Sequence, residues 1–69
     1  MELWFNRYDR YFRACILFDD KDTMSYQSSD LEHIYAWFTA IENIMTIPSE
    51  ITKEFYDRYL IFKNMKGDK

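Results

Sequence analysis

The residues best suited to chemistry lie between Ser28 and Tyr35, where carboxylates stand beside apolar and aromatic side chains. Asp30 and Glu32 are the carboxylates of this segment. A second acidic group comes shortly before it, at Asp19, Asp20 and Asp22. Ionised carboxylates accept strong hydrogen bonds from cationic donors. The two groups together are therefore suited to binding a basic surface.

The same segment has the pattern of a helix start. Ser29 and Glu32 have the spacing of a capping box, in which the hydroxyl accepts the Glu32 amide N–H and the carboxylate reaches back. Asp30 adds negative charge at the positive end of the helix dipole. Apolar residues then recur at helical spacing, which predicts a helix from Asp30 to about Met45. Glu32 thus has two open interpretations, a cap or a contact with a partner.

Catalysis and metal binding have little support in the sequence. His33 is the only histidine, and Asp30 and His33 alone are too few ligands for a metal site. Cys15 lies in an apolar run, where a small core residue is the expected role. The chain has no glycine-rich phosphate loop, no nucleophile motif and no calcium loop. We therefore expect no enzyme, no metal and no cofactor.

The composition points to a single domain that associates with another surface. The chain has 69 residues, of which 48% are hydrophobic and 20% aromatic, and a domain of this size has a thin core. Large rings in excess of that core favour a homodimer or a tight partner, although rings can also simply fill a small core. The net charge of −3 argues against direct binding of nucleic acid. A single cysteine suits a reducing cytoplasm, and no membrane span is visible.

The elements that would position the acidic residues form an α+β pattern. Residues 8–18 alternate loosely and predict a strand, with Phe12, Ala14, Ile16 and Phe18 on one face. Residues 23–27 can return as a second strand, which makes a hairpin. Residues 2–7 fit either a strand extension or a helical turn. We expect a small antiparallel sheet packed on the amphipathic helix, within one domain at 1–66 and a frayed tail at 67–69.

The C-terminal third is ambiguous. Ser49 is a good N-cap, and Ile51, Phe55 and Tyr59 have the four-residue spacing of a helix. Residues 58–63 fit either a continuation of that helix or a third strand. The strand is favoured here because an isolated two-stranded hairpin is only marginally stable.

The order of these motifs resembles that of a known family. Tyr8-Asp9, a strand closing on Asp19-Asp20, an aromatic strand around Tyr26, and Ser-Asp-Leu-Glu-x-x-Tyr at 29–35 are similar to the small uracil-DNA glycosylase inhibitors of Bacillus-infecting podophages. The resemblance covers about the first half of the chain. The family has an aromatic residue where this chain has Leu31, and the segment after Tyr35 is longer here.

The resemblance implies a phage-encoded homodimer that mimics DNA in the host bacterial cytoplasm. Uracil-DNA glycosylase flips its target base out of the duplex and holds the DNA in a basic cleft. A mimic needs carboxylates in place of phosphates and an apolar recess for the wedge residue of the enzyme. The residues that would supply this partner-binding surface are Asp19, Asp20, Asp30, Leu31, Glu32, Tyr35, Tyr26 and Phe38. The alternatives are a small acidic inhibitor of another host DNA-processing or defence protein, and a self-associating structural subunit.

Overall fold

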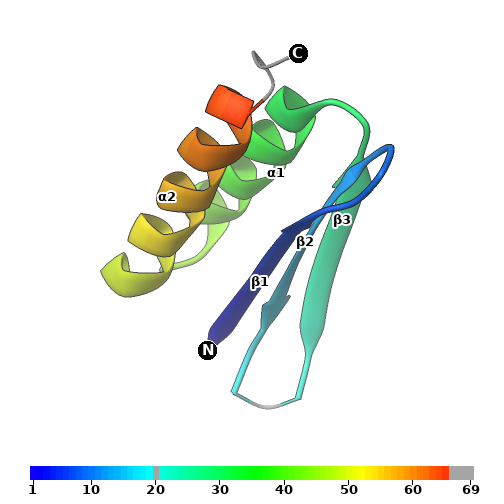
Figure 1. Ribbon diagram of the computed structural model, residues 1–69. Helices are drawn as coiled ribbons and strands as arrows, with labels where there is room; N and C mark the ends of the chain where they lie inside the picture. The colour runs from blue at the N-terminus through cyan, green and yellow to red at the C-terminus, as the bar shows by residue number, and fades with distance from the viewer. Residues whose placement is uncertain (20, 66–69) are drawn as a thin grey trace.

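The computed structural model describes residues 1–19 and 21–65 as a three-stranded sheet with two helices on one face (Figure 1). The elements in chain order are β1 (Glu2–Arg7), β2 (Phe12–Leu17), β3 (Thr23–Ser28), α1 (Leu31–Ile44) and α2 (Ser49–Met65). The strands are antiparallel in the spatial order β1-β2-β3. This architecture confirms the α+β class and the sheet packed on a helix. The frayed tail predicted at 67–69 lies outside the described residues.

The N-terminal segment is a strand of its own. The strand predicted over 8–18 is shorter in the structure. The chain reverses between Tyr8 and Tyr11, so that β2 begins only at Phe12. The Tyr8 amide N–H donates to the Tyr11 carbonyl at 2.8 Å, and the two rings stack with centroids 4.9 Å apart. The third strand of the sheet is therefore β1, paired with β2 along its whole length.

The predicted hairpin of β2 and β3 is confirmed, with Phe12 opposite Ser28 and Leu17 opposite Thr23. At its turn the Phe18 amide N–H donates to the Asp22 carbonyl at 2.8 Å. Lys21 has a φ of 76°, in the left-handed region that glycine favours. The turn thus closes without the glycine that usually accompanies it.

The strand favoured at 58–63 is wrong, because these residues continue α2 to Met65. Ile51, Phe55 and Tyr59 are buried, and Phe62 extends the same apolar face against the core. This spacing keeps one stripe of a helix pointed at the sheet. Since β1 supplies the third strand, the sheet does not need another from this segment.

Stacked aromatic rings form the centre of the core. The Phe55 ring lies between Phe38 and Phe5, with centroid separations of 4.0 Å and 4.8 Å. All three side chains are almost completely buried. Ala14 and Ile16 form the floor beneath them on β2. The helices therefore join the sheet through ring stacking, which adds to the burial of apolar area.

The free edge of β1 is partly blocked by α2. The Arg58 guanidinium donates from Nη1 to the Phe5 carbonyl at 3.0 Å. Because Tyr8 bonds toward β2 and backbone groups alternate in direction along a strand, the Phe5 carbonyl points away from β2. The contact occupies an acceptor that an exposed edge would otherwise offer to another strand.

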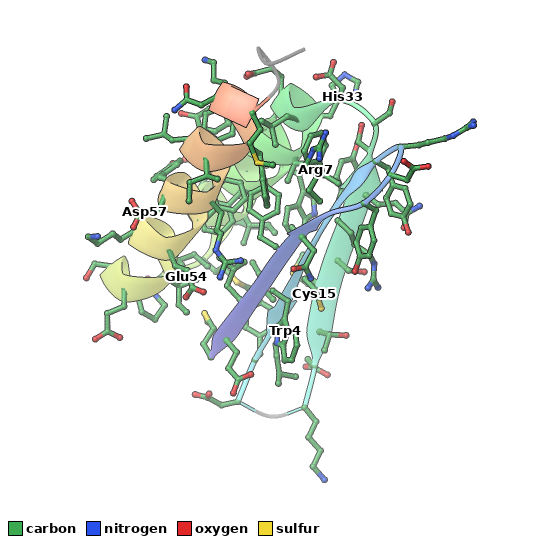
Figure 2. All side chains as sticks on the ribbon, in the orientation of Figure 1. Trp4, Arg7, Cys15, His33, Glu54 and Asp57 are labelled. Atoms are coloured by element: carbon green, nitrogen blue, oxygen red, sulfur yellow. The ribbon has the colours of Figure 1, made fainter. Side chains whose placement is uncertain are left out.

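The sheet face that points away from the helices carries Trp4 and also Cys15, which we expected to be a core residue. Trp4 is 57% exposed, and Cys15, its partner across the β1–β2 ladder, is only half-buried. Figure 2 shows both labelled side chains on the side of the sheet opposite α1 and α2. The strand alternation explains this placement, because Ala14 and Ile16 take the inner positions and leave position 15 outside.

Candidate functional site

The two acidic groups of the predicted surface lie at opposite ends of β3. The β2–β3 turn carries Asp19 and Asp22, whereas α1 begins at the far end of the same strand (Figure 1). A six-residue extended strand separates its ends by roughly 17 to 20 Å. The prediction that these carboxylates cluster together is therefore wrong. Asp20 lies outside the described residues.

The turn end contains a local ion pair. The Asp19 carboxylate accepts a hydrogen bond from the amino group of Met1 at 2.8 Å. This hydrogen bond lowers the pKa of Asp19 and raises the pKa of the amino group. The Asp19 carboxylate is almost fully exposed, and an ion pair in contact with water contributes little to stability.

At the other end of β3, α1 begins with an aspartate cap. The Asp30 carboxylate accepts the Glu32 amide N–H at 3.0 Å, and Ser28 Oγ accepts the Asp30 amide N–H at 3.0 Å. The predicted capping box of Ser29 and Glu32 is therefore wrong. Because β3 continues through Ser28, the first helical residue is Leu31, and the third helical position falls on His33 instead of a glutamate.

The Glu32 side chain takes no part in the cap and contacts α2 instead. Its carboxylate accepts a hydrogen bond from the Tyr59 hydroxyl at 2.6 Å. This bond, together with burial and the negative charge of Glu32, raises the pKa of Tyr59 to about 12. The Lys63 ammonium lies 5.6 Å from the centre of the Tyr59 ring. Glu32 is thus held in a fixed position while its side chain stays exposed.

A second carboxylate is held in the same way further along α1. Glu42 accepts the Tyr56 hydroxyl at 3.0 Å on one oxygen and the Thr52 hydroxyl at 3.1 Å on the other. Burial is the main cause that raises the pKa of Tyr56, and the hydrogen bond to Glu42 adds to it. Glu32 and Glu42 are ten residues apart on α1, which places their backbones roughly 15 Å apart along the helix.

Tyr35 joins these two contacts. Its ring centroid lies 4.8 Å from that of Tyr59 and 5.7 Å from that of Tyr56, and the side chain is 36% exposed. We call this line of residues along the α1–α2 contact the tyrosine–carboxylate seam: Glu32, Tyr35, Glu42, Tyr56 and Tyr59. The seam can accept hydrogen bonds from cationic groups at its carboxylates and stack planar groups on its rings.

Two residues predicted for the partner-binding surface lie in the core. Leu31 is 4% exposed and Phe38 is completely buried, because both are on the helix stripe that faces the sheet and α2. Tyr26 is exposed, but it stacks on Trp37 at 5.8 Å on the β3 side of α1. The structure therefore brings Glu32 and Tyr35 together at the α1–α2 contact. Leu31 and Phe38 point into the core instead, and Tyr26 lies on the β3 side of α1.

The sequence-based prediction missed Glu42, Tyr56 and Tyr59 as site residues. The strand assigned to 58–63 hid them, since a strand would have separated Tyr56 from Tyr59. The continuation of the apolar spacing from Tyr59 to Phe62 was the signal that could have found them.

Asp30 and His33 lie together at the start of α1. Within residues 1–19 and 21–65, no three His, Cys, Asp or Glu side chains are placed to hold a metal ion. His33 Nε2 lies 3.7 Å from the Asp30 carboxylate, and Ser28 Oγ lies 3.2 Å from His33 Nδ1. This side-chain cluster is explained by the helix cap.

In the part of the chain that the structure describes, neither helix has the length and apolar character needed to cross a membrane. The chain matches no protein-family model, no curated protein and no solved structure.

Proposed function

We propose that this chain is a phage-encoded protein inhibitor that mimics DNA and binds the DNA cleft of uracil-DNA glycosylase in the cytoplasm of a host bacterium, without catalysing a reaction. The observation that carries the proposal is the tyrosine–carboxylate seam. Glu32 is an exposed fixed acceptor and Glu42 a half-buried one, and Tyr35 lies exposed between them in the sequence of α1. In this proposal the two carboxylates take the places of phosphates and the ring takes the place of a base.

The fixed position of the carboxylates favours tight binding. A flexible glutamate loses side-chain entropy when it is held by a partner, and a glutamate that is already oriented loses less. The tyrosine hydroxyls leave part of each carboxylate free for a second donor, since an ionised carboxylate has about four acceptor positions. A basic cleft would meet both carboxylates with charge-assisted hydrogen bonds.

The choice of glycosylase as the target comes from the order of motifs in the first half of the chain. Leu31 and Phe38 are buried, so a wedge residue of the enzyme would contact the rings of Tyr35 and Tyr56. In this proposal Asp19 and Asp30 add to the negative field and lie outside the seam.

A uracil-excision assay tests the target. With the purified protein in excess, we expect loss of excision by bacterial uracil-DNA glycosylase on a uracil-containing duplex. Glu32→Lys should weaken inhibition at least about tenfold, because it replaces an oriented acceptor with a like charge. Glu50→Lys makes the same charge change at the exposed start of α2 and should leave inhibition within about threefold. Full excision in the presence of excess protein would contradict the proposed target.

A different DNA-processing or defence protein with a basic cleft would fit the same seam. Retention of a host protein from bacterial lysate on the immobilised wild-type chain, but not on the Glu32→Lys variant, would identify such a target. If the two variants retain the same proteins, the seam is not the binding surface.

A further inference from the structure

The sheet face opposite the helices has an apolar centre. Each strand directs alternate side chains to this side. We call it the outer sheet face, and the ladder pairings assign to it Glu2, Trp4, Asn6, Arg13, Cys15, Leu17, Thr23, Ser25 and Gln27. A shallow depression of about 340 Å³ lies on it, with Trp4, Cys15 and Leu17 among its lining residues. Neither helix covers this face (Figure 2).

Trp4 is the main feature of this face. Its side chain is 57% exposed and lines the same depression as the half-buried Cys15 and Leu17. An exposed tryptophan in an apolar patch with a polar border is typical of the contact residues that dominate protein interfaces. The face is therefore suited to a partner surface of the same apolar character.

The charges of the outer sheet face are complementary to those of a second copy. The ladder places its residues in three rows across the strands, Glu2–Leu17–Thr23, Trp4–Cys15–Ser25 and Asn6–Arg13–Gln27. The acidic residue is in the first row and the basic residue in the third. If a second copy is turned end for end, Glu2 of each copy comes opposite the row of Arg13 of the other.

We propose that the outer sheet face binds the same face of a second copy, through a two-fold axis along the row Trp4–Cys15–Ser25. Each face of such a dimer is the same patch, as two-fold symmetry requires. Trp4 then packs against its symmetry mate at the β1 end of this row. Arg13 lies one strand spacing, about 4.8 Å, to the side of the partner's Glu2, within the reach of an arginine side chain.

The size of the face predicts a weak dimer. Three strands of about six residues cover roughly 14 by 20 Å, which places the contact in the small class of interfaces found in transient complexes. We expect a dissociation constant in the range of roughly micromolar to millimolar. This dimer leaves the seam on α1 and α2 free, so the inference does not depend on the proposed function.

Sedimentation equilibrium over a wide range of concentration tests the contact. The wild type should pass from monomer to dimer and form nothing larger. Trp4→Lys should raise the dissociation constant at least about tenfold, since it removes the largest apolar contact. Leu60→Lys is a matched control, because Leu60 is 53% exposed on α2, and it should change nothing. Circular dichroism of each variant confirms that the fold is retained.

A charge exchange tests the orientation of the two copies. Glu2→Lys and Arg13→Glu should each weaken the dimer about two- to tenfold, because each dimer contains the pair twice. The double variant with both changes should recover the wild-type dissociation constant. A double variant weaker than either single variant would overturn the end-for-end arrangement.

Cys15 provides a covalent readout, since it is the only cysteine and lies on the proposed axis. Packed sheets are about 10 Å apart, which is too far for a direct disulfide. A short bis-maleimide should therefore link two copies, and Trp4→Lys should abolish the product. A wild-type chain that stays monomeric at millimolar concentration, or a dimer that Leu60→Lys abolishes and Trp4→Lys preserves, would overturn the inference.

Discussion

The two faces of the sheet differ both in their side chains and in their surroundings. Phe5 on the inner face is 1% exposed and stacks on Phe55, whereas Trp4, the adjacent residue in the same strand, is 57% exposed. The large aromatic residues of the sheet therefore divide between a buried and an exposed face. Composition alone could not distinguish these positions, since an aromatic count does not record the face on which each ring lies.

The largest expected effect is on the inner face. Phe55→Ala should lower the free energy of unfolding by about 3–5 kcal/mol, because it removes the ring between Phe5 and Phe38 and leaves a cavity. Urea denaturation measures the loss, and Phe55→Leu, which should cost less, keeps the measurement possible if the alanine variant unfolds. A cost below about 1 kcal/mol for Phe55→Ala would remove the distinction between the two faces.

Removing the cap of α1 tests how much the start of this helix contributes to the free energy of unfolding, in comparison with packing in the core. Asp30→Ala should cost about 1 kcal/mol, because the Glu32 amide N–H loses its acceptor. Ser29→Ala should be close to neutral by the same denaturation experiment. A larger loss of stability for Ser29→Ala than for Asp30→Ala would instead support the capping box that the sequence predicts.

Tyr59, which lies at the edge of the core, should make the stability of the protein sensitive to alkaline pH. The pKa of Tyr59 is raised from 10.0 to about 12, so its contribution is fully present below pH 10 and is lost as the pH rises towards 12. An absorbance titration should show one of the six tyrosines ionising near pH 12, and Tyr59→Phe should remove that step. At pH 7 this variant should cost about 1 kcal/mol.

The smallest expected effect is on the outer face. Trp4→Ala should change the free energy of unfolding by no more than about 0.5 kcal/mol in dilute solution, since the side chain is mostly exposed. Comparison with Phe55→Ala under the same conditions gives the contrast directly. A loss as large as that of Phe55→Ala would mean that Trp4 belongs to the core of the monomer.

Local patterns predicted much of the fold. The spacing from Leu31 to Ile41 specified α1, and the alternation around Ala14 and Ile16 specified the inner face of β2, because both patterns repeat over several residues. The segments 2–7 and 58–63 were ambiguous for a shared reason. Which of them completes the sheet depends on contacts between residues far apart in the chain.

The candidate site was less predictable for the same physical reason. Glu32 and Tyr35 are on one helix, so the sequence could bring them together. The bond from Tyr59 to Glu32 joins residues 27 positions apart, and no local pattern encodes it. The separation of Asp19 from Asp30 could have been expected from the strand between them, since an extended chain keeps its ends apart.

The contact between Arg58 and the Phe5 carbonyl affects how readily the chain aggregates at high concentration. A sheet can polymerise only if strands add at both of its edges. With the acceptor at the middle of β1 already taken, a strand added at that edge would lose one of its backbone hydrogen bonds. One guanidinium therefore makes accidental sheet growth at the β1 edge less favourable, in a small chain rich in the residues that favour fibres.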